Sequence, residues 1–229
     1  MKLNEEEIQA LYQFTRAHFV YHFDVQTELV DHLANGIELE QAKNPNVTFQ
    51  EALHKEFKKF GVFGFQGVVE KRQKALSKKY WKLILRFYKA YFSLPKIMLT
   101  LCLSTLLFTL LKAIPVTYQH YTLLGIFMLF LIPATLKMVQ YQKIIKRKER
   151  KWMLEEMLLT QMGFFSIIQL PIQLVNIKFE IENDYILGVV SIFTVSLLLL
   201  FYVLVFVIPS KAGVLLAETY PEYKMLQIL

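Results

Sequence analysis

The sequence lacks the residues and motifs on which most enzymes depend. Cysteine occurs once, at Cys102 within an apolar run, so the chain can form no intrachain disulfide and has no cysteine spacing typical of a metal site. The phosphate-binding loop ending in Gly-Lys-Ser/Thr, the Gly-x-Ser-x-Gly turn and the His-Glu-x-x-His zinc motif are all missing. We therefore expect no catalytic residues, no cofactor and no metal site, and a protein that is not an enzyme.

The first residues also lack the features of a cleavable signal peptide. They read Asn4-Glu-Glu-Glu7, which is acidic and amphipathic, with neither a basic region nor an apolar core. We expect this N-terminal segment to remain in the cytoplasm.

Positive charge is concentrated in short stretches. The chain has a net charge of +7, and 55% of its residues are hydrophobic, which is above the usual range for a soluble domain. Residues 1–70 hold six Lys or Arg against eleven Asp or Glu, whereas residues 71–96 hold nine Lys or Arg and no acid. Nucleic-acid-binding proteins can show such a basic run. This one directly precedes an apolar span, so we interpret it as membrane-flanking and expect no nucleic-acid partner.

A second basic stretch, residues 143–151, contains six Lys or Arg and one Glu between two apolar runs. A short basic loop between spans is typical of the cytoplasmic side of a membrane, because Lys and Arg resist translocation. We expect the basic side chains of both stretches to lie at the anionic membrane surface: Lys71, Arg72, Lys74, Lys78, Lys79, Lys82, Lys146, Arg147, Lys148, Arg150 and Lys151.

Four segments are long and apolar enough to span a bilayer, which takes about 20 residues. They are residues 94–114, 121–139, 158–177 and 185–208. The third is the most polar. Links at residues 112–120 and 176–184 are poor in Lys and Arg, so the positive-inside rule predicts that both termini are cytoplasmic. A tail at 210–229 follows, which can form a short amphipathic helix at the membrane surface.

Helical spacing before the spans predicts a cytosolic domain over residues 1–70 and a basic amphipathic connector helix over 71–92. The first helix is expected at 4–22, with Asn4 and Glu7 in capping-box spacing and Phe19 on its apolar side. Asp24 is expected to cap a second helix to about Ala42, with an apolar stripe at Val25, Leu29, Leu33 and Ile37. After a turn at 44–47, Thr48 and Glu51 are expected to cap a third helix that buries Phe49, Leu53, Phe57 and Phe60. Gly61 ends it, and a helix from about Gln66 follows.

Part of this domain resembles a known family. Glu28-Leu-Val-Asp-His-Leu33, then Ile37, Thr48-Phe-Gln-Glu-Ala52 and Phe60-Gly61 are similar to the HAAS-type helical domain. Proteins of that family usually carry this domain ahead of membrane spans and are often encoded beside PadR-type transcription regulators. The chain departs from the pattern in its longer turn at 44–47 and at 61–65, where Gly-Val-Phe-Gly-Phe stands. The resemblance implies a regulatory or scaffolding role and brings no catalytic residues.

Polar side chains of the second helix form a candidate partner-binding patch. Glu28, Asp31 and His32 fall on one side of the predicted helix and could bind a protein partner or respond to pH. The alternative is a solvated surface, or ion pairs with Lys55, Lys58 or Lys59 of the third helix, which are weak when exposed. His18 and His22 are four residues apart, as zinc ligands can be, but lack a third ligand, so we expect ordinary histidines.

The third predicted span carries a polar stripe, Ser166, Gln169, Gln173 and Asn176, which should face the interior of the bundle. These residues could line a path for a small molecule, or they could form hydrogen bonds between helices. The predicted spans have no Asp, Glu or Arg at mid-depth, which argues against an ion-coupled transporter.

The sequence therefore predicts an all-α, multi-pass protein of the bacterial inner membrane, with a cytosolic helical domain followed by a four-helix transmembrane bundle. Its leading function is regulation, signalling or scaffolding through a protein partner, with the lipid bilayer as its environment and homo-oligomers expected. The alternative is a small transport or permease subunit that uses the polar stripe.

Overall fold

The computed structural model of the protein describes residues 2–161, 181–220 and 222–223. Over these residues the secondary structure is helical and no β-strand forms; an isolated bridge pairs His22 with Lys151. The prediction of an all-α fold is confirmed. The chain divides into two compact units, which we call the N-terminal unit (Met1–Lys78 and Lys148–Leu154) and the apolar unit (Lys79–Arg147 and Glu155–Leu229).

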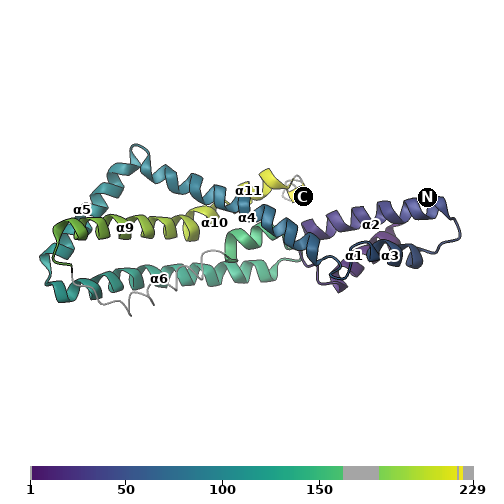
Figure 1. The fold of residues 1–229 in the computed structure, drawn as a ribbon, viewed down its shortest axis with the longest axis horizontal. Coiled ribbons are helices and arrows are strands. Elements are labelled where there is room, and N and C mark those ends of the chain that lie inside the picture. The colour runs from purple at the N-terminus through teal and green to yellow at the C-terminus, as the bar shows by residue number, and fades with distance from the viewer. Residues whose placement is uncertain (1, 162–180, 221, 224–229) are drawn as a thin grey trace. The chain divides into compact units, whose positions relative to one another are not determined.

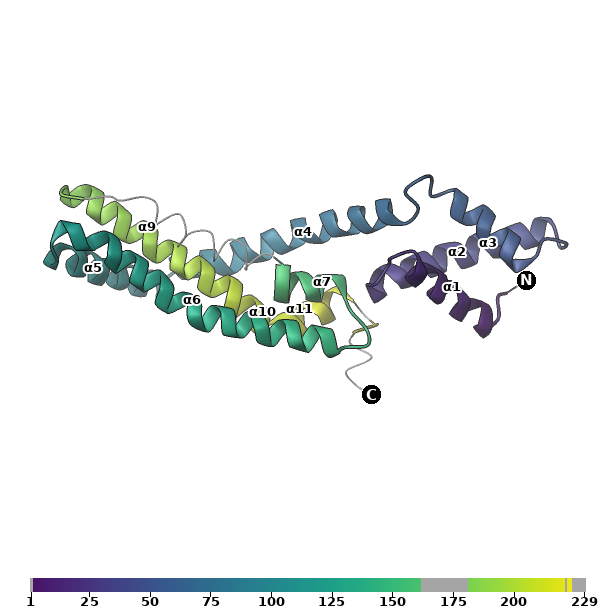
Figure 2. The ribbon, with the colours of Figure 1, turned by 90° about the horizontal axis from the view of Figure 1, so that it is seen from below.

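Three helices, α1 (Glu5–Ala17), α2 (Phe23–Lys43) and α3 (Phe49–Lys58), lie side by side in the N-terminal unit (Figure 1 and Figure 2). Both predicted capping boxes are present, Asn4 with Glu7 at α1 and Thr48 with Glu51 at α3. In each box, side-chain oxygens accept backbone N–H groups that the first turn of a helix leaves unpaired.

The core of this unit follows the predicted apolar stripe of α2. Val25, Leu29, Leu33 and Ile37 are all at most 2% exposed, and α2 contacts both α1 and α3. An aromatic cluster closes one end of the unit, with Phe57 and Phe65 ring centroids 4.9 Å apart. Its members are Phe14, His18, Phe57, Phe60 and Phe65.

The third helix buries different residues from those predicted. Leu53 is buried as expected, but Phe49, Phe57 and Phe60 are only half-buried. The residues of α3 that are buried beside Leu53 are Ala52 and Glu56, because Gly36 of α2 has no side chain and leaves room for the Glu56 carboxylate. The rings of Phe57 and Phe60 instead belong to the aromatic cluster.

The first helix is shorter than predicted and ends at Ala17. Phe19 adopts a left-handed φ of 66°, and the amide of Val20 donates to the carbonyl of Thr15 at 3.1 Å. This turn places Val20 in the core, whereas Phe19, predicted on the buried side, is 78% exposed. The prediction that Asp24 caps the second helix is also wrong: His22 is the N-cap residue, and Asp24 lies buried inside the first turn.

The fourth helix, α4 (Gln66–Lys89), begins where the sequence predicts, and the division between the two units falls within it, after Lys78. Tyr80 of α4 is 1% exposed within the apolar unit, and burial raises its pKa to about 12. A short 3-10 helix, Ala90–Phe92, leads to α5 (Lys96–Ala113).

Three helical runs of the apolar unit are long and apolar enough to cross a membrane. They are α5, α6 (Val116–Arg147), and α9 (Asp184–Tyr202) continued by a π-helical turn (Val203–Val207) and α10 (Ile208–Ser210). The predictions of spans at 94–114, 121–139 and 185–208 are confirmed to this extent. The predicted span at 158–177 lies, beyond Gln161, outside the described residues.

Helix α6 is longer than its predicted span. It has 32 residues, about 48 Å at 1.5 Å per residue, against about 30 Å of hydrocarbon in a bilayer. The predicted basic loop at 143–151 is therefore helical as far as Arg147, and only its last residues leave the helix. The predicted link at 112–120 is likewise shortened to the two residues between Ala113 and Val116.

Helices α5 and α9 pack against each other with opposite chain directions. Lys112, in the last turn of α5, forms an ion pair with Asp184, the first residue of α9. Between the helices lies an apolar cluster that also includes a residue of α6: Leu107, Leu111, Leu123, Ile181, Leu187 and Val195.

The described remainder of the apolar unit includes a helix after the last span. α11 (Ala212–Thr219) forms within the predicted tail and buries Ala212, Leu215 and Leu216. Lys79 of α4 donates to Thr219 of α11 at 2.7 Å. Along the chain after α6, α7 (Met153–Glu156) is continued by a π-helical turn, Met157–Gln161, where the first described range ends.

Candidate functional site

The predicted partner-binding residues lie on the solvent side of α2. Glu28, Asp31 and His32 are all exposed. The ring of His32 lies 5.5 Å from that of Phe60, at the end of α3, and Glu28 lies 3.9 Å from the guanidinium of Arg72 in α4. The predicted alternative was an ion pair between these residues and Lys55, Lys58 or Lys59 of α3. The structure shows no such pair among the described residues.

Those lysines have other partners or none among the described residues. Lys55 pairs with Glu40, and this hydrogen bond lowers the pKa of the Glu40 carboxyl. Lys59 pairs with Glu56. Among the described residues no ion pair forms at Asp31, and Glu28 has one cation nearby, Arg72, at 3.9 Å.

An apolar tip lies in the turn between α3 and α4, two residues after Phe60, whose ring packs on His32 of α2. Val62 is 99% exposed and Phe63 is 79% exposed. Gly61 and Gly64 flank them with φ angles of 75° and 52°, a backbone region that residues other than glycine rarely adopt. At Gly64 a Cβ atom would also lie only 3.1 Å from the Phe57 ring. The turn thus holds two apolar side chains away from the aromatic cluster.

His18 and His22 lie at the ends of two different helices. His18 follows the end of α1, and its ring lies 4.5 Å from Phe57, with Nδ1 2.8 Å from the carbonyl of Phe14. His22 comes after the turn at Phe19, so the two do not share one side of a helix. Within the described ranges, no group of three His, Cys, Asp or Glu could hold a metal ion.

Sequence reasoning missed a long-range contact between the N-terminal helices and the segment after α6. We call this segment, Lys148–Leu154, the docked loop. The amide of Phe23 donates to the carbonyl of Lys151 at 2.7 Å, and the amide of Met153 donates to the Asp24 carboxylate at 3.1 Å. Trp152 is 3% exposed, and its ring lies 5.3 Å from Phe23. The loop is therefore part of the core of the N-terminal unit.

A polar hollow of about 740 Å³ lies between the docked loop and the start of α2. Its aromatic wall is formed by Tyr12 and Phe23, whose rings are almost parallel with centroids 6.3 Å apart. The guanidinium of Arg150 lies 4.9 Å above the Phe23 ring. The lining residues are Gln9, Tyr12, Arg16, Tyr21, Phe23, Gln26, Glu149, Arg150 and Lys151.

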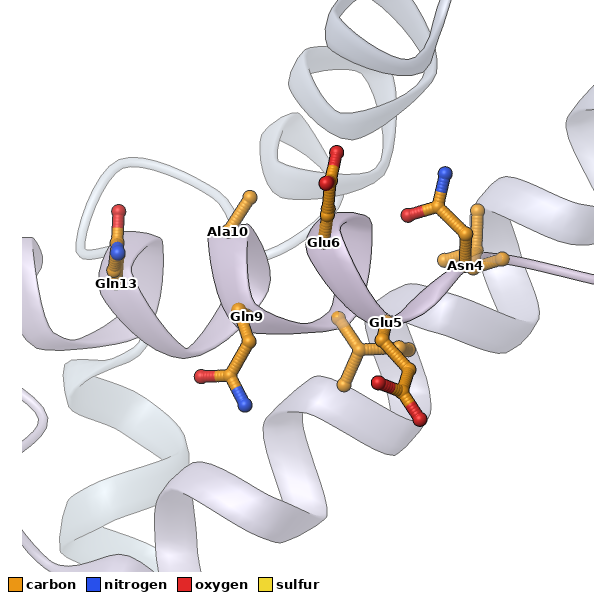
Figure 3. A pocket seen from close by; sticks show the side chains of 8 residues that line it. Asn4, Glu5, Glu6, Gln9, Ala10 and Gln13 are labelled. Carbon is orange, nitrogen blue, oxygen red and sulfur yellow. The ribbon is translucent and has the colours of Figure 1, made fainter.

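A second hollow of similar size runs along the outside of α1 (Figure 3). Glu6, Ala10 and Gln13 point to one side of the helix there, and Glu5 and Gln9 point to the other. The glutamates and glutamines are exposed, and no Lys or Arg lines the hollow, so it is an ordinary solvated helix surface.

Two further predictions concern the membrane part of the chain. The polar stripe of Ser166, Gln169, Gln173 and Asn176 lies outside the described residues. Most of the predicted surface cations of α4, α6 and the docked loop are exposed, as a contact with lipid headgroups requires, and three are half-buried: Arg72, Lys148 and Lys151.

Comparisons of the chain with protein-family models, with curated proteins and with solved structures found no match.

Proposed function

We propose that this protein is a non-enzymatic regulatory or scaffolding protein of the bacterial inner membrane, and that its N-terminal unit binds a cytosolic protein. The observation that carries the proposal is the exposed apolar tip of Val62 and Phe63, which follows Phe60, the residue whose ring packs on His32 at the exposed side of α2. Exposed apolar side chains rimmed by charge are typical of protein-binding surfaces. The resemblance to HAAS-type domains favours a partner that controls transcription or signalling.

The charges of this surface define the partner. Glu28 and Asp31 are exposed, and His32 packs on Phe60, which directly precedes the tip. A matching partner presents an apolar pocket for Phe63 with Lys or Arg side chains at its edge, because the apolar contact supplies affinity and the charges orient the encounter.

We also propose four spans, with both termini in the cytoplasm. Two contacts support this topology. The docked loop, at the end of α6, belongs to the same unit as the N-terminal helices. Asp184, at the start of α9, pairs with Lys112 at the opposite end of the α5–α6 hairpin. A chain that leaves α6 on one side and begins α9 on the other crosses the membrane once more in between.

The topology has a direct test by cysteine labelling. In a Cys102→Ala background, a single cysteine at Tyr185, which is 87% exposed, should react with an impermeant maleimide in intact spheroplasts. A single cysteine at Glu149 should react only after permeabilisation. If the cysteines at positions 185 and 149 were labelled from the same side of the membrane, the proposal of four spans would be contradicted.

Partner binding is tested by photocrosslinking from the intact protein in cells. A benzoylphenylalanine at Phe63 should crosslink to a transcription or signalling regulator, identified by mass spectrometry, and Asp31→Lys should weaken the crosslink. The control is the same probe at Gln13, an exposed position on α1. If Phe63 and Gln13 yield the same species, or Phe63 yields transporter subunits, the regulatory proposal fails.

A further inference from the structure

The polar hollow beside the docked loop brings together cations from two distant parts of the sequence. Arg16 comes from the last turn of α1, and Arg150 and Lys151 come from the docked loop. One acid, Glu149, also lines the hollow, so its lining carries a surplus of positive charge. Within the described part of the chain, none of these three cationic side chains forms an ion pair with a carboxylate.

The geometry holds Arg150 ready for an anion. Its guanidinium lies 4.9 Å from the centroid of the Phe23 ring, and Phe23 in turn stacks with Tyr12. A cation–π contact occupies the flat side of a guanidinium and leaves the N–H donors at its edge available. Those donors form a planar fork that matches the oxygens of a phosphate.

The rest of the hollow suits a small ligand better than a protein side chain. Its volume of about 740 Å³ is in the range of small-molecule sites. Gln9 and Tyr21 supply exposed polar groups at its edge, whereas Gln26 is buried and donates to the carbonyl of Val20 at 2.6 Å. The chemistry of the lining is thus cationic and hydrogen-bonding around an aromatic wall.

We propose that this hollow binds a small phosphate-bearing anion, held between Arg16 on α1 and Arg150 and Lys151 on the docked loop. The anion can be the headgroup of an acidic phospholipid or a soluble phosphate compound. In either case it bridges segments that otherwise meet through few polar contacts, and so it fastens the loop to the N-terminal helices. The site is independent of the proposed partner surface at Val62 and Phe63.

The docked loop supplies its own reporter. The chain has two tryptophans, and a Trp81→Phe background leaves Trp152, buried against Phe23 at the wall of the hollow. The full-length protein is placed in nanodiscs of phosphatidylcholine and titrated with pyrophosphate, with potassium chloride at matched ionic strength as baseline. A second preparation contains phosphatidylglycerol and no added pyrophosphate.

A soluble ligand is indicated by a saturable change of Trp152 emission with pyrophosphate in phosphatidylcholine. A lipid headgroup is indicated if the emission change instead accompanies phosphatidylglycerol. In the responding arm, Arg16→Gln and Arg150→Gln should each weaken binding about tenfold or more, because each removes charge-assisted hydrogen bonds. Circular dichroism checks that both variants keep their helix content.

The matched control is Lys58→Gln, which removes one exposed positive charge from the same unit at a position outside the hollow. It should leave the response unchanged. The proposal is overturned if neither anion changes Trp152 emission beyond the chloride baseline, if the two arginine variants respond like the parent protein, or if Lys58→Gln weakens the response as much as they do.

Discussion

In α2, the side chains of Val25, Leu29 and Leu33 are shielded from solvent, whereas in α5 Leu99, Leu101 and Leu106 each expose more than half of their surface. Both helices belong to one chain and both carry several leucines. The N-terminal unit covers its apolar stripe with its own helices, but only 22% of the apolar window of α5 and of α6 is buried by protein. The difference teaches that the N-terminal unit covers its own apolar side chains, whereas α5 and α6 leave most of theirs exposed, as helices that could cross a membrane do.

The sharpest way to break this comparison is to truncate one leucine in each unit. Leu33→Ala should destabilise the N-terminal unit by about 2–5 kcal/mol, because Leu33 is fully buried and its removal leaves a cavity. Leu106→Ala, on the 64% exposed side of α5, should change stability by less than about 0.5 kcal/mol. In the full-length protein, hydrogen exchange of the α1, α2 and α3 amides measures the first effect, and exchange of the α5 amides measures the second. Equal effects would show that the two units do not differ in how they bury leucine.

The docked loop offers the next largest effect. Asp24→Ala removes the acceptor of the buried Met153 amide, which should cost about 1–3 kcal/mol and loosen the loop. Trypsin should then cut faster after Lys148, Arg150 and Lys151. Asp31→Ala, an exposed acid on the same helix, is the matched control and should leave the cleavage rate at its parent value. Unchanged cleavage in Asp24→Ala would mean that this hydrogen bond does not hold the loop.

A smaller effect is expected at the start of α3. Thr48→Ala removes the side-chain oxygen that accepts the Glu51 amide and should cost about 1 kcal/mol. Amides in the first turn of α3 should exchange faster, while those of α9 should not change. Gln50→Ala, an exposed position in the same turn, is the control, and a similar loss there would assign the effect to helix propensity instead of capping.

The same capping box gives a pH dependence to the N-terminal unit. Hydrogen bonds from the backbone and the side chain of Thr48 lower the pKa of the Glu51 carboxyl from its ordinary value. A lowered folded-state pKa means that the contribution to stability is fully present above the unfolded value and is lost as the pH falls through the folded one. Hydrogen exchange of α3, followed from pH 6 to pH 3, should show this loss, and Glu51→Gln should remove it. An identical acid profile in Glu51→Gln would assign the loss to other carboxylates.

The smallest effect is expected in the apolar unit. Lys112→Gln removes the ion pair with Asp184, in which both side chains are more than half exposed. Exposed pairs contribute about 0–1 kcal/mol, so thermal unfolding in nanodiscs should shift little. A large loss of stability would show that this pair, and not the apolar packing of α5 against α9, holds the two helices together.

Features that depend on neighbours in sequence were predictable. Asn4 with Glu7 and Thr48 with Glu51 form capping boxes because the two residues of each box are three positions apart. The buried stripe of α2 follows from spacing at every fourth residue. Three spans follow from the length and composition of their apolar runs. In all these cases the information lies within one or two helical turns.

Features that depend on distant residues were missed. Aspartate is a common N-cap residue, so the position of Asp24 before an apolar stripe suggests a cap. Its carboxylate instead accepts a hydrogen bond from the amide of Met153, 129 residues away. The polar hollow was missed for the same reason, because Arg16 and Arg150 line one hollow only when residues distant in sequence come together. Residues 143–147 looked like a loop from charge alone, yet Lys and Arg favour helices and suit a helix C-terminus, so α6 continues through them.

The docked loop has a consequence for the order of biosynthesis. Residues 148–154 complete the core of the N-terminal unit, yet they follow α5 and α6 in the chain. The ribosome must therefore synthesise the whole α5–α6 hairpin before Trp152 and Leu154 exist to fill their places. Until α5 and α6 have been synthesised, part of the core of the N-terminal helices therefore stays uncovered. Completion of this unit is thus coupled to the insertion of the α5–α6 hairpin.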